Sequence, residues 1–182
     1  MDLMLKNVRL AFPNLFEPRS FGEDDTPARS ASFILPPDHP QAKEIEQVLA
    51  FVAEEKWKAK GAAMLKQLRA TGKTCLRNGD DKADYDGFAG NFYVSARSTG
   101  PVLVIDQLRN TLTKDSGKPY AGCYVNAKVE IWAQDNKFGK RVNATLKGVQ
   151  FLRDGDAFAG GAPAKQDDFE EIADTGSTDA DF

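Results

Sequence analysis

Residues 120–134 read YAGCYVNAKVEIWAQ, and from Cys123 onward apolar and polar side chains alternate along this stretch. Successive side chains of a β-strand point to opposite sides, so a period of two predicts a strand with one buried face. The face predicted to be buried carries Cys123, Val125, Ala127, Val129 and Ile131. The opposite face carries aromatic, amide and charged side chains, namely Tyr120, Tyr124, Asn126, Lys128, Glu130 and Trp132. We therefore expect a β-rich core and a polar outer surface that contains aromatic rings.

Other segments with the composition of strands are bounded by Gly, Pro, Asn and Asp. These segments are residues 3–10, 28–35, 91–98, 102–106 and 141–151. In the last of them the alternation changes phase at Gly148, which predicts a β-bulge. Residues 12–18 contain two prolines and are predicted to form a loop after the first strand.

One stretch has the period of a helix, because Ile45, Val48, Leu49 and Val52 recur on one face. Asp38 is the expected cap of this helix, with Gln41 three residues later as in a capping box. A second short helix is expected over residues 62–70, followed by a polar segment to Gly90. The sequence thus predicts a mainly β fold with a helical insertion.

Charge is distributed unevenly along the chain. Residues 166–182 contain seven acids and no Lys or Arg, whereas residues 1–165 carry 24 basic and 20 acidic groups, a net charge of +4. A basic folded part is compatible with a nucleic-acid partner even though the whole chain has a net charge of -3. After Gly155 the composition shifts to Ala, Gly, Pro and acids, with too few apolar residues for a core. We predict a folded domain over residues 1–155 and a flexible, disordered acidic tail over residues 156–182.

The outward faces of three predicted strands combine aromatic rings with cations. This combination is typical of proteins that bind single-stranded DNA, because cations follow the phosphates and rings stack on any base. Two further cations, Lys73 and Arg77, precede the polar segment and are expected to flank the DNA. The predicted DNA-binding residues are Lys73, Arg77, Tyr93, Arg97, Tyr120, Tyr124, Lys128, Trp132, Arg141 and Lys147.

Two other functions remain open from the residues alone. A metal-dependent nuclease would use carboxylates such as those of Asp80, Asp84 and Asp86. A protein-interaction adaptor would work through the tail without binding DNA. His39 is the only histidine, so neither a histidine dyad nor a His-rich zinc site can form. We expect a protein that is not an enzyme and that needs no metal or cofactor.

The cellular setting is inferred from features that the chain lacks. It has no run of 18 apolar residues and no N-terminal segment of the signal-peptide type, so no membrane partner is expected. Cys75 and Cys123 are expected to be reduced thiols of a cytoplasmic protein.

Three blocks of the sequence resemble a family of tailed-phage proteins: FPNLFEP (residues 12–18), GCYVNA (122–127) and LKGVQF (146–151). The resemblance implies an OB-fold, which is a five-stranded Greek-key barrel, over residues 1–155. It also implies sequence-nonspecific binding of single-stranded DNA during phage DNA replication and recombination in the bacterial host cytoplasm. A helix between the second strand and the later ones departs from the simplest OB layout.

The last four residues, Asp179-Ala180-Asp181-Phe182, resemble the acidic, Phe-terminated tails of short-tailed-phage and bacterial single-strand binders. The resemblance implies that Asp179, Asp181 and Phe182 recruit replication or recombination proteins.

Overall fold

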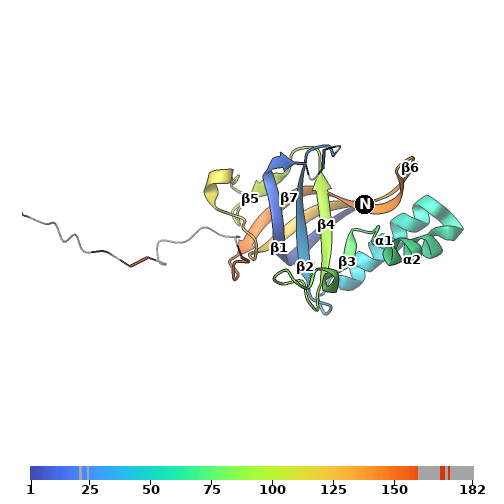
Figure 1. Ribbon diagram of the computed structural model, residues 1–182, viewed down its shortest axis with the longest axis horizontal. Coiled ribbons are helices and arrows are strands. Elements are labelled where there is room, and N and C mark those ends of the chain that lie inside the picture. The colour runs from blue at the N-terminus through green and yellow to red at the C-terminus, as the bar shows by residue number, and fades with distance from the viewer. Residues whose placement is uncertain (21, 24, 160–168, 171, 173–182) are drawn as a thin grey trace, which may run out of the picture.

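In the computed structural model, which describes residues 1–20, 22–23, 25–159, 169–170 and 172, one sheet closes into a barrel (Figure 1). Its strands are β1 (Asp2–Arg19), β2 (Ala28–Leu35), β3 (Leu76–Asn78), β4 (Phe92–Ser98), β5 (Leu103–Ile105), β6 (Tyr124–Asn136) and β7 (Gly139–Arg153). The ring runs β1-β2-β4-β7-β6 and returns to β1, while β3 extends the edge of β4 and β5 pairs with β7. If the five strands of this ring are numbered 1 to 5 in chain order, their order around the barrel is 1-2-3-5-4. Within the ring only the contact between β4 and β7 is parallel. The predicted mainly β OB-fold is confirmed.

The alternation along β6 holds as predicted. Cys123, just before β6, and the strand residues Val125, Ala127, Val129 and Ile131 are all fully buried in the barrel core. The predicted bulge in β7 is also confirmed. Lys128 pairs with Gly148 while Val129 pairs with Leu146, so the pairing skips one residue of β7. The bulge lets residues on both sides of it face the core despite the change of phase.

The first strand differs from its prediction. Residues 12–18 do not form a loop but continue β1 as far as Arg19. The pairing of β1 with β2 shifts register between Ala11 and Asn14, and Pro13 lies at this irregularity. A proline is tolerated at a bulge because no ladder hydrogen bond is required from its missing N–H.

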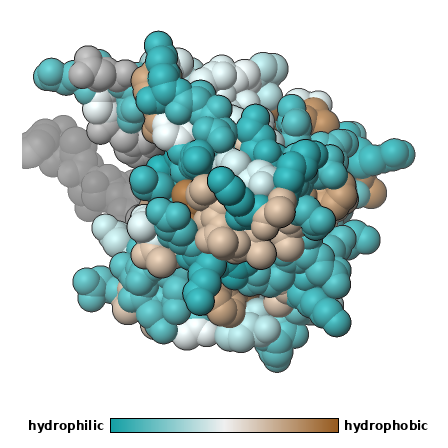
Figure 2. Space-filling view, turned by 90° about the vertical axis from the view of Figure 1, so that its right-hand side faces the viewer, coloured by the Kyte–Doolittle hydropathy of each residue, from teal (hydrophilic) through white to brown (hydrophobic). Residues whose placement is uncertain are grey.

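Two helices close one end of the barrel: α1 (Ala42–Trp57) and α2 (Gly61–Ala70), joined by η1 (Lys58–Lys60). The apolar face of α1 is buried in the core, as its period predicts. Asp38 is not its cap; Gln41 precedes the helix, and its side chain instead accepts from the Lys6 N–H and donates to the Met4 carbonyl, both at 2.7 Å. This end of the molecule is mainly hydrophilic on its outside (Figure 2). No helix in the part of the chain described is long and apolar enough to cross a membrane.

After β7 residues 154–159 lie against the barrel, and we call them the strap. The Arg9 side chain donates to the carbonyls of Gly122 (3.0 Å) and Asp156 (2.8 Å), and the Phe158 N–H donates to the Ala121 carbonyl (3.0 Å). The described chain thus stays in contact with the barrel four residues beyond the predicted domain boundary. Both cysteines are buried free thiols.

Candidate nucleic-acid interface

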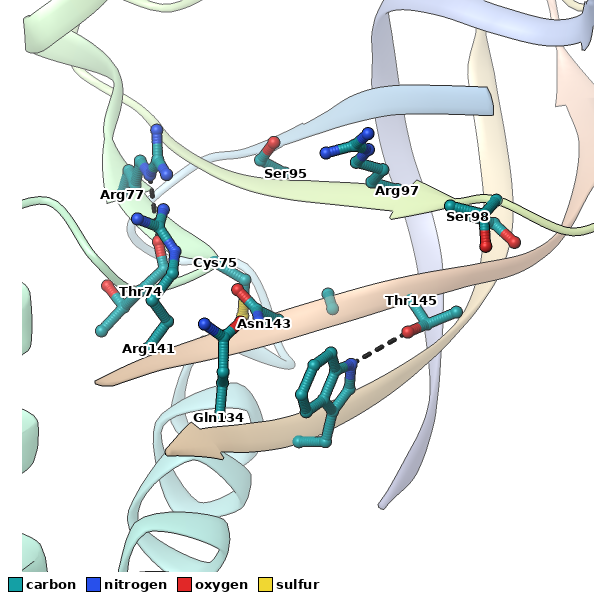
Figure 3. A pocket seen from close by; sticks show the side chains of 13 residues that line it. Thr74, Cys75, Arg77, Ser95, Arg97, Ser98, Gln134, Arg141, Asn143 and Thr145 are labelled. Atoms are coloured by element: carbon teal, nitrogen blue, oxygen red, sulfur yellow. Dashed lines mark hydrogen bonds between the residues drawn. The ribbon is translucent and has the colours of Figure 1, made fainter. Parts of the chain in front are cut away.

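Side chains on the outer faces of β4, β6 and β7 and at the start of β3 line an open groove of about 500 Å³ (Figure 3). We call it the cationic groove and define it by Arg77, Arg97, Arg141 and Trp132. The strands bring these residues together because β4 pairs with both β3 and β7, and β7 pairs with β6. In Figure 3, Arg77 and Arg141 lie toward one end of the groove and Thr145 toward the other.

The charged side chains that line the groove are three arginines. Arg77 donates from Nε to the Thr74 carbonyl (3.0 Å), and Arg97 donates from Nη2 to the Thr26 carbonyl (2.5 Å). Both bonds are to neutral groups, so each guanidinium keeps its charge and its remaining donors. No acidic side chain is among the described residues that line the groove. Burial raises the pKa of the Cys75 thiol to about 12, so this lining residue adds no negative charge either.

Trp132 provides the ring of the cationic groove. Its indole Nε1 donates to Thr145 Oγ1 at 2.9 Å, drawn as a dashed line in Figure 3. The side chain is 39% exposed. The hydrogen bond fixes the orientation of the ring across the β6–β7 pair, while part of its surface is free to contact a planar group.

A second and larger hollow of about 930 Å³ adjoins this groove and shares Ser95 and Arg97 with it. Phe12, Lys82, Tyr85 and Phe88 are among its lining residues, and we call the hollow the aromatic bowl. The two depressions form one continuous path across the outer face of the barrel, with Arg97 where they meet.

Of the ten predicted DNA-binding residues, the structure brings Arg77, Arg97, Trp132 and Arg141 together. For two of the predicted aromatic residues, Tyr93 and Tyr120, the expectation of an exposed ring is wrong. Tyr93 does lie on the outer side of β4, but the Phe88 ring covers it at a centroid distance of 5.1 Å, and it is 2% exposed. Tyr120 precedes β6 and is buried, with its hydroxyl donating to Asp154 Oδ1 at 2.6 Å.

The other four predicted residues lie outside the cationic groove. Lys128 and Lys147 are exposed and pair with Asp2 (3.7 Å) and Glu130 (3.1 Å). Lys73 lies beside Thr71 and Lys140 in a separate hollow near α2. Tyr124 is half-buried under the Arg153 guanidinium, which lies 3.7 Å from the ring centroid. The predicted tail residues Asp179, Asp181 and Phe182 are outside the described residues.

Two of the three acids considered for a nuclease, Asp80 and Asp86, accept hydrogen bonds from the backbone. Asp80 Oδ1 accepts from the Gly90 N–H (2.8 Å), and Asp86 Oδ2 accepts from the Ala159 N–H (3.2 Å). Within the described ranges, no three His, Cys, Asp or Glu side chains are grouped so that they could hold a metal ion. The segment that carries these acids forms one wall of the aromatic bowl.

Phe12, Lys82 and Tyr85, which line the bowl, were not predicted from the sequence as binding residues. Phe12 belongs to a segment that was expected to be a loop, and the other two belong to the polar segment after α2. The sequence signal that could have identified them is the presence of aromatic residues within otherwise polar stretches rich in proline or aspartate.

Similar proteins come from phages. Protein p50 of Acyrthosiphon pisum secondary endosymbiont phage 1 is 43% identical over 176 residues, covering 95% of each chain. The single-stranded DNA-binding protein from bacteriophage Enc34, solved in complex with ssDNA, is 27% identical with a TM-score of 0.73, covering 86% of this chain and 88% of that one.

The gp2.5 protein, a single-stranded DNA binding protein encoded by bacteriophage T7, has a TM-score of 0.60. The match covers 94% of this chain and 98% of that chain, and at 12% identity it is a likeness of fold alone. Residues 1–181 match the family described as Enterobacter phage Enc34, ssDNA-binding protein, and the chain belongs to that family.

Proposed function

We propose that this chain binds single-stranded DNA without sequence preference, in phage DNA replication and recombination, and that it is not an enzyme. Its place of action is the cytoplasm of the bacterial host. The observation that carries the proposal is the cationic groove, where three arginines and the exposed Trp132 meet on the outer face of an OB-fold. Membership of a family described by an ssDNA-binding protein supports the same function.

The groove is better suited to single-stranded DNA than to a duplex, which proteins recognise by the edges of its base pairs. Guanidinium groups of Arg77, Arg97 and Arg141 neutralise phosphates whatever the sequence, and an indole stacks on any exposed base. Bases of a duplex are stacked on one another, so they do not offer a face to Trp132. Sequence tolerance follows because none of these contacts reads the donor and acceptor pattern of a base.

Fluorescence anisotropy of labelled oligo-dT with the full chain, measured over a range of salt concentrations, tests the proposal. We expect the logarithm of affinity to fall linearly with the logarithm of salt concentration, with a slope of about −0.7 for each phosphate contacted. Arg97→Gln and Arg141→Gln should each weaken binding and reduce this slope by about 0.7. Lys147→Gln is the control, because its side chain is exposed and paired outside the groove.

Absence of binding at low salt, or an equal effect of Lys147→Gln and the two arginine variants, would contradict the assignment of this groove. Cleavage of the oligonucleotide with Mg²⁺ or Mn²⁺ that is lost in Asp84→Asn would instead favour a nuclease.

We also propose that the acidic tail recruits replication or recombination proteins through Asp179, Asp181 and Phe182. The charge asymmetry of the sequence and the resemblance of the last four residues support this role. Pull-down of host and phage replication proteins by the full chain, and its loss on deletion of residues 179–182, is the corresponding test.

A further inference from the structure

The aromatic bowl holds two exposed rings that the cationic groove does not use. Phe12 of β1 is 42% exposed and Tyr85 is 54% exposed. Their ring centroids are 5.1 Å apart with an interplanar angle of 85°, and the buried Phe88 ring lies beneath them at 5.7 Å from Phe12 and 6.4 Å from Tyr85. Neighbouring rings that keep this much surface in water provide a site for a further planar group.

The backbone at Phe12 is held in an unfavourable conformation. Its φ is +48°, in the left-handed region that favours glycine, and Phe12 directly precedes Pro13. A residue before proline is normally restricted to extended conformations, so this left-handed geometry is costly. The pairing of β1 with β2 shifts register at this position, between Ala11 and Asn14, and the Phe12 ring is exposed. Such strain is typical of positions where a side chain has a task in binding.

The opposite wall of the bowl is an ordered segment rather than a loose loop. η2 (Gly79–Lys82) begins after Asn78, whose Oδ1 accepts from the Asp80 N–H at 3.0 Å. Asn91 Nδ2 donates to the Gly87 carbonyl at 2.8 Å. A Cβ atom at Gly79 would lie only 2.0 Å from the Phe88 carbonyl oxygen, so the two ends of the segment are in close contact. These contacts order the segment that carries Tyr85.

Lys82 places a cation among these rings. Its Nζ lies 5.3 Å from the Phe12 centroid, 5.7 Å from that of Phe88 and 5.2 Å from that of Tyr93. Burial, and then the charge of Arg77, lower the pKa of this amine. Among the described residues no carboxylate forms an ion pair with it, so it is available to an anionic ligand.

The remaining charges of the bowl also suit a polyanion. Arg19 and Arg97 line it, against Asp84 and Asp86. Asp86 accepts a hydrogen bond from the strap, at the Ala159 N–H. With Lys82, the cations outnumber the acids, and the path continues into the cationic groove through Ser95 and Arg97.

We propose that the aromatic bowl is a base-binding subsite for the same DNA strand that occupies the cationic groove. One unstacked base lies against Tyr85 and Phe12, and an adjoining phosphate lies on Lys82. The inference rests on the proposed function, since a strand in the groove delivers the next nucleotide to the bowl. Rings bind bases of any identity, so the subsite senses the presence of a base rather than its sequence.

The test uses the full chain and the shortest oligo-dT that it binds with full affinity. A single abasic nucleotide is moved along this oligonucleotide, and affinity is measured by anisotropy at constant salt. Loss of one stacked base should weaken binding about 5- to 150-fold at the position that meets the bowl. In Tyr85→Ala this penalty should shrink at that position alone, while Tyr85→Phe, which keeps the ring, should retain it.

Phe51→Ala is the matched control, because Phe51 is 49% exposed on α1 and lines neither depression. Lys82→Met gives a second readout: its slope of log affinity against log salt should fall by about 0.7. Equal abasic penalties in the unmodified chain, Tyr85→Ala and Phe51→Ala would overturn the subsite and leave DNA binding intact. No binding of oligo-dT by the unmodified chain would overturn the proposed function and the subsite together.

Discussion

At the scale of single residues, Tyr120 shows how an aromatic side chain of this fold serves stability. Its hydroxyl donates to Asp154 Oδ1 at 2.6 Å and accepts from the Gly155 N–H at 3.3 Å, tying the strap to the barrel. Burial, and then the hydrogen bond to Asp154, raise the pKa of Tyr120 to about 12. The neutral phenol is therefore favoured in the folded state, since the pKa of an unperturbed tyrosine is about 10.

We expect Tyr120→Phe to lower the free energy of unfolding at pH 7 by about 0.5–1.5 kcal/mol, because the hydrogen bond from its hydroxyl to Asp154 is lost. The contribution of the neutral phenol is fully present below pH 10 and is lost as the pH rises through 12. The unmodified chain should therefore lose stability over that range more steeply than the variant. Urea denaturation followed by tryptophan fluorescence measures both effects; equal stability and equal pH dependence would contradict them.

Residue-level reasoning found part of the candidate site. Strand alternation correctly assigned Arg97, Trp132 and Arg141 to the outer face of the barrel. The same reasoning placed Tyr93 on that face but could not tell that Phe88, five residues earlier, covers it. A period of two reports the side of the sheet to which a residue points, whereas its exposure depends on segments that pack there from elsewhere.

At the scale of elements, the strap is held by packing as well as by hydrogen bonds. The Phe158 ring packs on the cluster of Ala11, Ile34, Phe88 and Tyr93, and the Arg9 guanidinium lies 4.4 Å from its centroid. Gly122 and Gly155 permit the close approach of the two backbones, since a Cβ at Gly155 would lie 2.3 Å from the Gly122 carbonyl oxygen.

Phe158→Ala should release the strap without unfolding the barrel. Removing a half-buried ring costs about 1–2 kcal/mol of local stability, so the amides of Phe158 and Ala159 should exchange with solvent about tenfold faster. Hydrogen–deuterium exchange with mass spectrometry measures this, and core strands such as β6 should be unaffected. The control is Phe169→Ala, because Phe169 is mostly exposed; unchanged strap exchange in Phe158→Ala would show that the hydrogen bonds alone hold it.

Features of a strand could be predicted where the signal lies within the strand itself. The prediction was wrong where the extent of a strand depends on the strands that pair with it. The bulge at Gly148 was visible as a change of phase within one strand. The continuation of β1 through Pro13 was not, because β1 pairs with β6 over its first half and with β2 over its second. A proline reads as the end of a strand unless the position of the partner strands is known.

At the scale of the whole molecule, the closure of the barrel was implied by resemblance rather than by the residue pattern. Closure depends on the parallel contact between Arg97 of β4 and Thr145 of β7, which are 48 positions apart in the sequence. Single-strand periodicity carries no information about such a contact. The same contact brings Arg97 beside Arg141 and Trp132, so the fold and the cationic groove arise together.

The uneven distribution of charge leads to a last prediction for the whole chain. Residues 161–182 carry seven acids and one lysine, and they follow a strap whose Phe158 and Ala159 line the aromatic bowl. Acids joined to the barrel at this point compete with phosphates for its cations at high effective concentration. A chain that ends at Gly160 should therefore bind oligo-dT at least as tightly as the full chain, with the larger gain at low salt, where charges are least screened. Anisotropy titrations of both chains at two salt concentrations measure this. Weaker binding by the shortened chain would mean that residues 161–182 contribute to DNA binding instead of opposing it.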